Sequence, residues 1–205
     1  MAKIKLTKGE LKRERDNLQQ YQRYLPTLQL KKQQLQLEIL QQLNVLGEKN
    51  QAKDKKKEAA KAWLGLLTEP GINLKQWLLP SSVVTGAKSV AGVDLPVFER
   101  IEFVHAEYDL FIMPLWVDFA IEALRQIVSA QEEIKIIEKG IEILRQELRI
   151  TTQRVNLFER VKIPEATKAI RLIKIYIGDQ MANAVGRSKI AKRKIEQAMF
   201  EGALV

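Results

Sequence analysis

The residues whose types and spacing could support chemistry gather between positions 99 and 109. Glu99, Glu102, Glu107 and Asp109 lie near His105, the only histidine in the chain. Carboxylates beside an imidazole are able to bind a metal ion or to transfer protons. A lone histidine, however, serves neither a multi-histidine metal site nor a catalytic triad well. Solvated charges on a β-hairpin explain the cluster better, so we predict neither catalytic residues nor a metal site here.

Motifs for nucleotide and thiol chemistry are absent from the sequence. There is no P-loop of the form GxxxxGK followed by Ser or Thr, and no GxGxxG follows a predicted strand. The chain contains no cysteine, which excludes disulfides, CxxC zinc sites and a thiol nucleophile. We therefore expect no bound cofactor, and a stand-alone enzyme is the least favoured class.

Basic residues near both ends of the chain carry more information. The net charge is +9 and the isoelectric point is near 9.6, which favours an acidic partner. The N-terminal group comprises Lys3, Lys5, Lys8, Lys12, Arg13 and Arg15, and the C-terminal group comprises Arg187, Lys189, Lys192, Arg193 and Lys194. If the chain folds back on itself, the two groups meet at one tip and repel each other unless a partner neutralises them. We predict that this tip binds a partner.

Two long helices with coiled-coil spacing are predicted to carry these groups. Apolar residues recur at intervals of three, four and seven, which is the pattern of the a and d positions of a heptad. The predicted seam consists of Leu11, Leu18, Leu25, Leu28 and Leu35 in the first helix and Ile141, Leu144, Leu148, Val155 and Phe158 in the second. The first helix is expected from about residue 8 to about residue 65, with Thr7 and Glu10 as a possible capping box.

The middle of the chain breaks this pattern. Residues 69–96 are rich in Pro, Gly and Ser and are expected to form loops and short elements. Residues 97–104 alternate apolar and polar side chains, which indicates a strand, and residues 106–113 are a candidate partner strand. Helix resumes near Leu115. The predicted segments are an N-terminal helix over 1–65, a small middle region over 66–114, and a C-terminal helix with a basic tail over 115–205.

These elements predict a mainly α protein, a long antiparallel two-helix coiled-coil hairpin with a small middle domain containing a short β-hairpin. A dimeric coiled coil is the alternative, but the long connection gives the chain room to return. Pro26 and Pro164 lie inside the predicted helices, where a proline costs about 3 kcal/mol, and we interpret them as helix bends. In an antiparallel hairpin the two prolines could lie at comparable heights.

No membrane span or signal peptide is predicted. The N-terminus is charged throughout, without an apolar core for a signal sequence. The most apolar stretch, residues 110–124, is short and is interrupted by Pro114, Asp118 and Glu122. We expect a soluble or peripheral protein in the cytoplasm.

Two motifs resemble a known family. The stretch "KLTKGELKRERDNLQQYQRYLPTLQLKKQQLQLEIL", residues 5–40, is similar to the N-terminal helix of the D subunit of V-type (archaeal/vacuolar-type) ATPases, in particular the bacterial branch. The stretch "RVNLFERVKIPE", residues 154–165, resembles the C-terminal signature of the same family. Both match in the expected order and at about the expected separation, whereas residues 66–114 carry little of the family's signature.

The resemblance implies a central rotor shaft that binds no nucleotide itself and transmits torque to or from a membrane rotor ring that moves protons or sodium ions. The implied partners are the catalytic and non-catalytic subunits of a hexameric ring, the small F subunit of the central stalk, and the d/C subunit above the membrane ring. The basic tip would then sit in the bore of the hexamer, and bends at Pro26 and Pro164 would shape the shaft as a cam. A basic coiled coil that binds nucleic acid or an anionic membrane is the rival interpretation.

Overall fold

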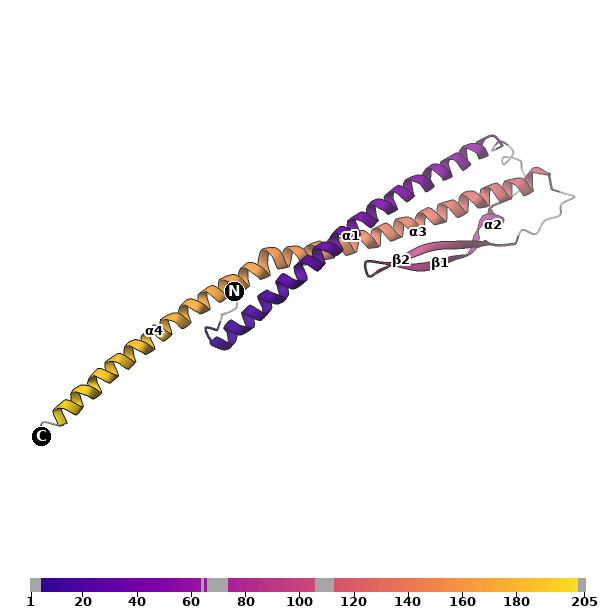
Figure 1. Cartoon of the computed structure of the whole chain (residues 1–205). Coiled ribbons are helices and arrows are strands. Elements are labelled where there is room, and N and C mark those ends of the chain that lie inside the picture. Colours follow the sequence, from indigo (N-terminus) through magenta and orange to yellow (C-terminus); the bar gives the residue numbers. More distant parts are fainter. Residues whose placement is uncertain (1–4, 64, 66–73, 106–112, 203–205) are drawn as a thin grey trace. The chain divides into compact units, whose positions relative to one another are not determined.

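A computed structural model describes residues 5–63, 65, 74–105 and 113–202, with side-chain environments as far as Met199. The elements are α1 (Lys8–Lys61), α2 (Lys75–Leu78), β1 (Pro80–Val90), β2 (Val93–Phe103), α3 (Trp116–Leu157), the π-helical segment η2 (Phe158–Lys162) and α4 (Ile163–Gly202) (Figure 1). The chain is mainly helical, its long N- and C-terminal helices are in contact, and a two-stranded antiparallel hairpin lies between them in the sequence. The predicted fold class is confirmed.

The chain divides into two compact units, and both long helical arms contribute to each. Unit 1 contains Met1–Gln29 and Gln153–Val205, and unit 2 contains Leu30–Thr152. The secondary structure described in unit 1 is all helical, while unit 2 also contains α2 and the β-hairpin.

Helix α1 begins where the sequence supplies a cap. The backbone N–H of Glu10 donates to Oγ1 of Thr7 at 3.2 Å, which satisfies one of the free donors of the first turn. The helix ends at Lys61, four residues before the predicted end. Only Leu35, Ile39 and Ala60 are buried over its 54 residues. The buried residues form a narrow stripe on one side of the helix. Long helices in proteins are stabilised mainly by packing of such a stripe, so contact with a partner helix stabilises α1.

In unit 2, α1 and α3 run in opposite directions, and two ion pairs define their register. Nζ of Lys31 lies 2.8 Å from Oε1 of Glu147, and Nζ of Lys49 lies 2.8 Å from Oε1 of Glu133. Moving forward along α1 from Lys31 to Lys49 therefore means moving backward along α3. Between these ion pairs Leu35 and Leu144 are both fully buried, in one apolar cluster. The pairing is antiparallel, as predicted.

The hairpin exists and contains the strand predicted at 97–104, but that strand pairs with the segment before it and not with the candidate partner after it. β2 pairs with β1, the segment before it, in a register that joins Pro80 to Phe103 and Val90 to Val93. The expectation of loops and short elements over 69–96 thus missed the long strand at 80–90 and the start of β2 at 93–96. The candidate partner at 106–113 lies outside the described residues except for Met113, which is not in a strand. The sequence analysis did not predict β1 as a strand. None of its residues is buried, so the segment lacks the clear apolar alternation that indicates a strand.

The turn of the hairpin also lacks the usual sequence signal. Ala91 and Gly92 have φ angles of 51° and 74°, so both turn residues adopt the left-handed conformation of a type I′ turn. Asn-Gly and Asp-Gly are the sequences that usually indicate a type I′ turn, whereas alanine is rarely found at positive φ. The Ala91 side chain is partly buried against the cluster around Leu35 and Leu144. A packing role therefore accounts for an unfavourable turn residue.

A second apolar cluster lies where α2 packs against the start of α3. Its buried members are Leu74, Trp77, Val117, Ala120 and Ile121. Trp63, at the end of α1, packs against the same cluster together with Trp116 and Leu124. The short helix α2 is thereby fixed to the first two turns of α3, and the start of the hairpin is fixed with it.

Replacing Gly140 by alanine is expected to stabilise the protein. Gly140 is buried in the middle of α3, and a Cβ atom there would meet nothing within 4 Å. Alanine favours the helix over glycine by about 1 kcal/mol, and the free space avoids a steric penalty. We expect Gly140→Ala to raise the free energy of unfolding by about that amount in urea denaturation. A lower midpoint would show that the space beside α3 is not available.

Candidate functional site: the helix seam, the α4 overhang and the Arg125 pocket

In unit 2 the seam between the helices is closed around two leucines. Leu35 and Leu144 are 0% exposed, and Ile39 and Leu148 pack beside them. The hairpin adds Leu95, which is buried, together with the partly buried turn residues. The seam at this level is therefore closed by three elements, α1, α3 and the hairpin.

In unit 1 the seam continues with an aromatic pair. The rings of Tyr21 and Phe158 lie with centroids 5.3 Å apart and planes tilted by 41°, a favourable arrangement for two aromatic side chains. On the C-terminal arm the buried residues of this unit are Val155, Ala166, Ala169, Ile170 and Ile173. Small residues such as the two alanines allow the helices to approach closely.

None of the ten side chains assigned to the seam from the sequence is exposed. Leu35, Ile141, Leu144 and Val155 are buried, and Leu11, Leu18, Leu25, Leu28, Leu148 and Phe158 are half-buried. Thr151, which interrupts the apolar row, is 1% exposed. The threonine side chain is small enough to fit between the helices, and it lies at the position where the heptad spacing predicts a seam residue.

Beyond Ile173, helix α4 leaves its partner. Ile173 is fully buried, whereas every residue from Gly178 to Met199 is exposed. We call Gly178–Met199 the overhang. In Figure 1, α4 runs past the start of α1 within unit 1 toward the C-terminus. Exposed Met181, Val185, Ile195 and Met199 lie along it at heptad-compatible spacing, with Ser188 and Lys192 interrupting the row. The overhang thus presents a seam without a partner among the described residues.

The described residues of the two basic groups are all exposed. Lys3 lies outside the described residues, while Lys5, Lys12, Arg13 and Arg15 are exposed at the start of α1. Arg187, Lys189, Lys192, Arg193 and Lys194 are exposed on the overhang. The described residues of the two groups thus lie on different helices of unit 1, and a shared tip stays a prediction. Sequence periodicity gives no information about where one helix stops covering the other.

The two prolines are accommodated in different ways. Immediately before Pro164 the helix widens into the π-helical segment η2, where the N–H of Ile163 donates to the carbonyl of Phe158. The wider turn gives the proline ring more space. Its hydrogen bonds join residues five apart instead of four, so the carbonyl that would otherwise lack a donor at the proline can be paired differently. Pro26 lies within continuous α1, and Oγ1 of Thr27 donates to the carbonyl of Tyr24 at 2.7 Å beside it. The sequence predicted special geometry at Pro164 but not its π-helical form.

The prolines do not lie at the same height in unit 1. Tyr21 and Phe158 are level, and Pro26 and Pro164 follow them by five and six residues on helices that run in opposite directions. At 1.5 Å per residue the prolines are about 16 Å apart along the axis. On this register, any bends at the two prolines would act at two levels.

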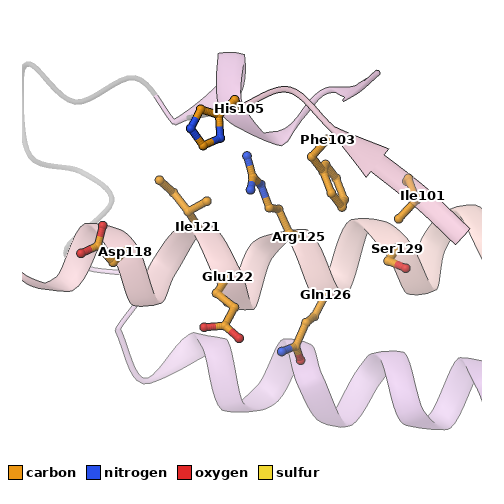
Figure 2. Close-up of a pocket in the computed structure, with 9 residues that line it drawn as sticks. All are labelled: Ile101, Phe103, His105, Asp118, Ile121, Glu122, Arg125, Gln126 and Ser129. Atoms are coloured by element: carbon orange, nitrogen blue, oxygen red, sulfur yellow. The ribbon is translucent and has the colours of Figure 1, made fainter. Parts of the chain in front are cut away.

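A pocket beside the hairpin is organised by Arg125, which the sequence analysis did not single out. Nε and Nη2 of Arg125 donate to the carbonyl of Trp77 at 3.1 and 3.0 Å, and Nη2 also donates to the carbonyl of Val104 at 2.6 Å. The guanidinium carbon lies 5.2 Å from the ring centroid of Phe103, within cation–π range. Figure 2 shows Arg125 reaching from α3 toward Phe103 and His105. One arginine on an amphipathic helix gives no sequence signal of this role.

The pocket itself is an open cavity of about 470 Å³ between β2 and α3. Ile101, Phe103 and Ile121 supply apolar walls, and His105, Asp118 and Glu122 are among the polar residues that line it. Of the acidic residues noted in the sequence, Glu102 pairs with Arg100 at 3.1 Å and accepts a hydrogen bond from Ser82 at 2.9 Å. Glu107 and Asp109 lie outside the described residues.

The described parts of the chain also bear on metal binding and on membrane insertion. No group of three or more His, Cys, Asp or Glu side chains there is placed to hold a metal ion. No helix in those parts combines the length and the apolar character needed to cross a bilayer.

Comparison with known proteins gives a consistent result over almost the whole chain. The family model for the D subunit of ATP synthase matches residues 10–193. A protein of Borreliella burgdorferi described as the D subunit of a V-type ATP synthase is 46% identical over 195 residues, covering 95% of this chain and 96% of that protein. Proteins with the same description from Chlamydia abortus and Chlamydia pneumoniae are 33% and 32% identical, each covering 98% of this chain and 97% of the relative.

Proposed function

The chain belongs to the D-subunit family of V-type ATP synthases, and from this premise we propose that it is the central rotor shaft of such a complex. The complex as a whole is an enzyme. In this proposal the chain has no catalytic residue or cofactor of its own. It transmits torque between a hexamer that hydrolyses or synthesises ATP and a membrane ring that moves protons or sodium ions.

The antiparallel helix pair is the observation that carries the proposal. A torque shaft must resist twisting, and two helices that interlock through a shared seam resist it better than one helix does. The seam is supported by the fully buried Leu35 and Leu144, and it is flanked by the ion pairs Lys31–Glu147 and Lys49–Glu133. Such partly exposed ion pairs add little stability each, but they fix the register of the two helices.

We further propose that the overhang is the part of the shaft that enters the bore of the hexamer. Its exposed apolar row can contact a bore lined by other subunits, and its five basic residues favour acidic loops there. The basic residues at the start of α1 would face the same bore at a different level. Exposed charge pairs are weak, so these contacts can slide as the shaft turns.

The remaining partners follow from the same reading. We propose that the other end of the shaft binds the small F subunit and the d/C docking subunit, which connects to the membrane ring. The chain would then reside on the cytoplasmic side of the membrane as part of a peripheral sector, without entering the bilayer.

The prolines have a place in this proposal as helix bends. Bends at two levels, near Pro26 and near Pro164, would make the shaft asymmetric, so that successive catalytic sites meet different faces. The Pro26→Ala/Pro164→Ala variant is expected to be more stable in isolation by about 1–3 kcal/mol, because helix-interior prolines are unfavourable and η2 already relieves part of that cost. Urea denaturation measures the gain. Unchanged ATP-driven rotation in a complex that contains the variant would contradict the cam role.

The test of the proposed function is a tagged pull-down from native membranes with mass spectrometry of the co-purifying chains. Two large ATPase subunits in near-equal amounts, with this chain at about one third of either, are the expected result for one shaft in a hexamer. Recovery of nucleic acid or ribosomal proteins instead would contradict the rotor proposal and favour a basic coiled coil that binds nucleic acid.

A further inference from the structure

The β1–β2 hairpin is attached to the helices of unit 2 at its tip. Leu95 is the only buried residue of the two strands, at 4% exposure, and it lies in one cluster with Leu35 and Leu144. Val90, Ala91 and Val93 surround it at the turn. The tip therefore covers the most tightly packed leucines of the helix seam.

The backbone of the tip is adapted to this contact. Ala91 holds a φ of 51°, a left-handed conformation that is unfavourable for a non-glycine residue. Glycine or asparagine would relieve the strain, but glycine would remove the methyl group that is partly buried in the cluster. We infer that the packing of the Ala91 methyl group against the helices offsets the strain in the turn.

The base of the hairpin is attached a second time, through Arg125. This side chain joins α3 to the carbonyl of Val104, directly after β2, and to the carbonyl of Trp77 in α2. It also lies over the ring of Phe103, the last residue of β2 (Figure 2). Hydrogen bonds from a charged donor are stronger than neutral ones, so a single side chain makes a substantial anchor.

Between the two anchors the hairpin does not fill the space beside the helices. A cavity of about 220 Å³ lies there, lined by Pro96, Val97 and Phe98 of β2 and by residues of α1 and α3 that include Val45 and Gly140. No residue of β1 is buried. A segment with so few buried contacts opens at a lower free energy than the core.

From this arrangement we propose that the hairpin is a detachable brace, anchored at its tip by Leu95 and at its base by Arg125, which opens from the helix pair as one unit. When docked, it closes the seam at Leu35 and Leu144 and stiffens this section. When it opens, those leucines lose their cover and the section becomes more compliant. The consequence for torque rests on the proposed rotor function, but the docking itself does not.

Hydrogen exchange of the full-length chain, followed by mass spectrometry of peptides, tests the brace. A two-stranded hairpin is only marginally stable alone in water, so an undocked hairpin exchanges its ladder amides. Truncating a buried leucine weakens docking by more than a factor of ten, so Leu95→Ala should accelerate exchange in both strands at least about tenfold. Peptides around Leu35 and Leu144 should accelerate too, whereas those around Val117 and Ile121 should not.

Arg125→Lys provides a second variant that keeps the charge but loses the planar set of donors. If the hairpin opens as one unit, this change at the base also accelerates exchange at the turn. Val83→Ala, at a more exposed position on β1, is the matched control and should change nothing. Acceleration confined to the peptide nearest each substitution, or equal acceleration across the whole chain, would overturn the proposal. Neither outcome depends on the pull-down that tests the rotor function.

Discussion

Replacing Leu144 by alanine is expected to lower the free energy of unfolding by about 3–4 kcal/mol. Leu144 is 0% exposed and lies opposite Leu35, where α1, α3 and the hairpin meet. The substitution removes the buried methyl groups and leaves a cavity that two rigid helices cannot easily close. Urea denaturation followed by circular dichroism at the helical wavelengths measures the loss.

Leu30→Ala is the matched control for that experiment. The same side chain is shortened on a long helix of the same protein, but Leu30 is 56% exposed. Surface substitutions of this kind usually change stability by less than about 0.5 kcal/mol. If the two variants lose the same amount, the seam as described does not hold the helices together.

Removal of the overhang is expected to separate folding from function. A chain that ends at Ile177 keeps all the residues of unit 1 that the structure describes as buried, because none from Gly178 to Met199 is buried. Its unfolding midpoint in urea should therefore match that of the full chain, since the described part of the removed segment contributes no packing. In a reconstituted complex, ATP-driven ion pumping should fall to background, because the proposed shaft no longer enters the bore.

A full-length variant tells which property of the overhang is responsible. Arg187, Lys189, Lys192, Arg193 and Lys194 are replaced by glutamine, which keeps the helix and the exposed apolar row. Partial pumping in this variant would assign the remainder to Met181, Val185, Ile195 and Met199. Full pumping by the truncated chain would contradict seating of the overhang in the bore.

The helical part of this fold could be predicted because its packing is periodic. A seam buried on one stripe forces apolar residues into three-four spacing, so the sequence of Leu11 to Leu35 is enough to predict an amphipathic helix and its core face. Polar exceptions do not disturb the pattern when they are small, as Thr151 shows by its burial. The capping residue Thr7 was equally readable, because capping depends on neighbouring residues only.

The parts that could not be predicted depend on contacts between distant segments. β1 lacks an apolar face because the hairpin contacts the helices mainly through its tip. The turn contains Ala91 because its methyl group packs against the cluster around Leu35 and Leu144, which local sequence does not indicate. The role of Arg125 depends on two carbonyls from α2 and from the end of β2. Likewise, the convergence of the basic groups depended on where α1 stops covering α4, which no local pattern encodes.

The exposed overhang also bears on the fate of chains that have not been assembled. Proteases that cleave after lysine or arginine need an accessible and locally unstable segment, and an unpaired helix end with five such residues is one. If the proposed hexamer encloses that end, the same bonds are out of reach. On the rotor proposal, the exposed overhang would then make unassembled copies more susceptible to proteolysis than assembled ones.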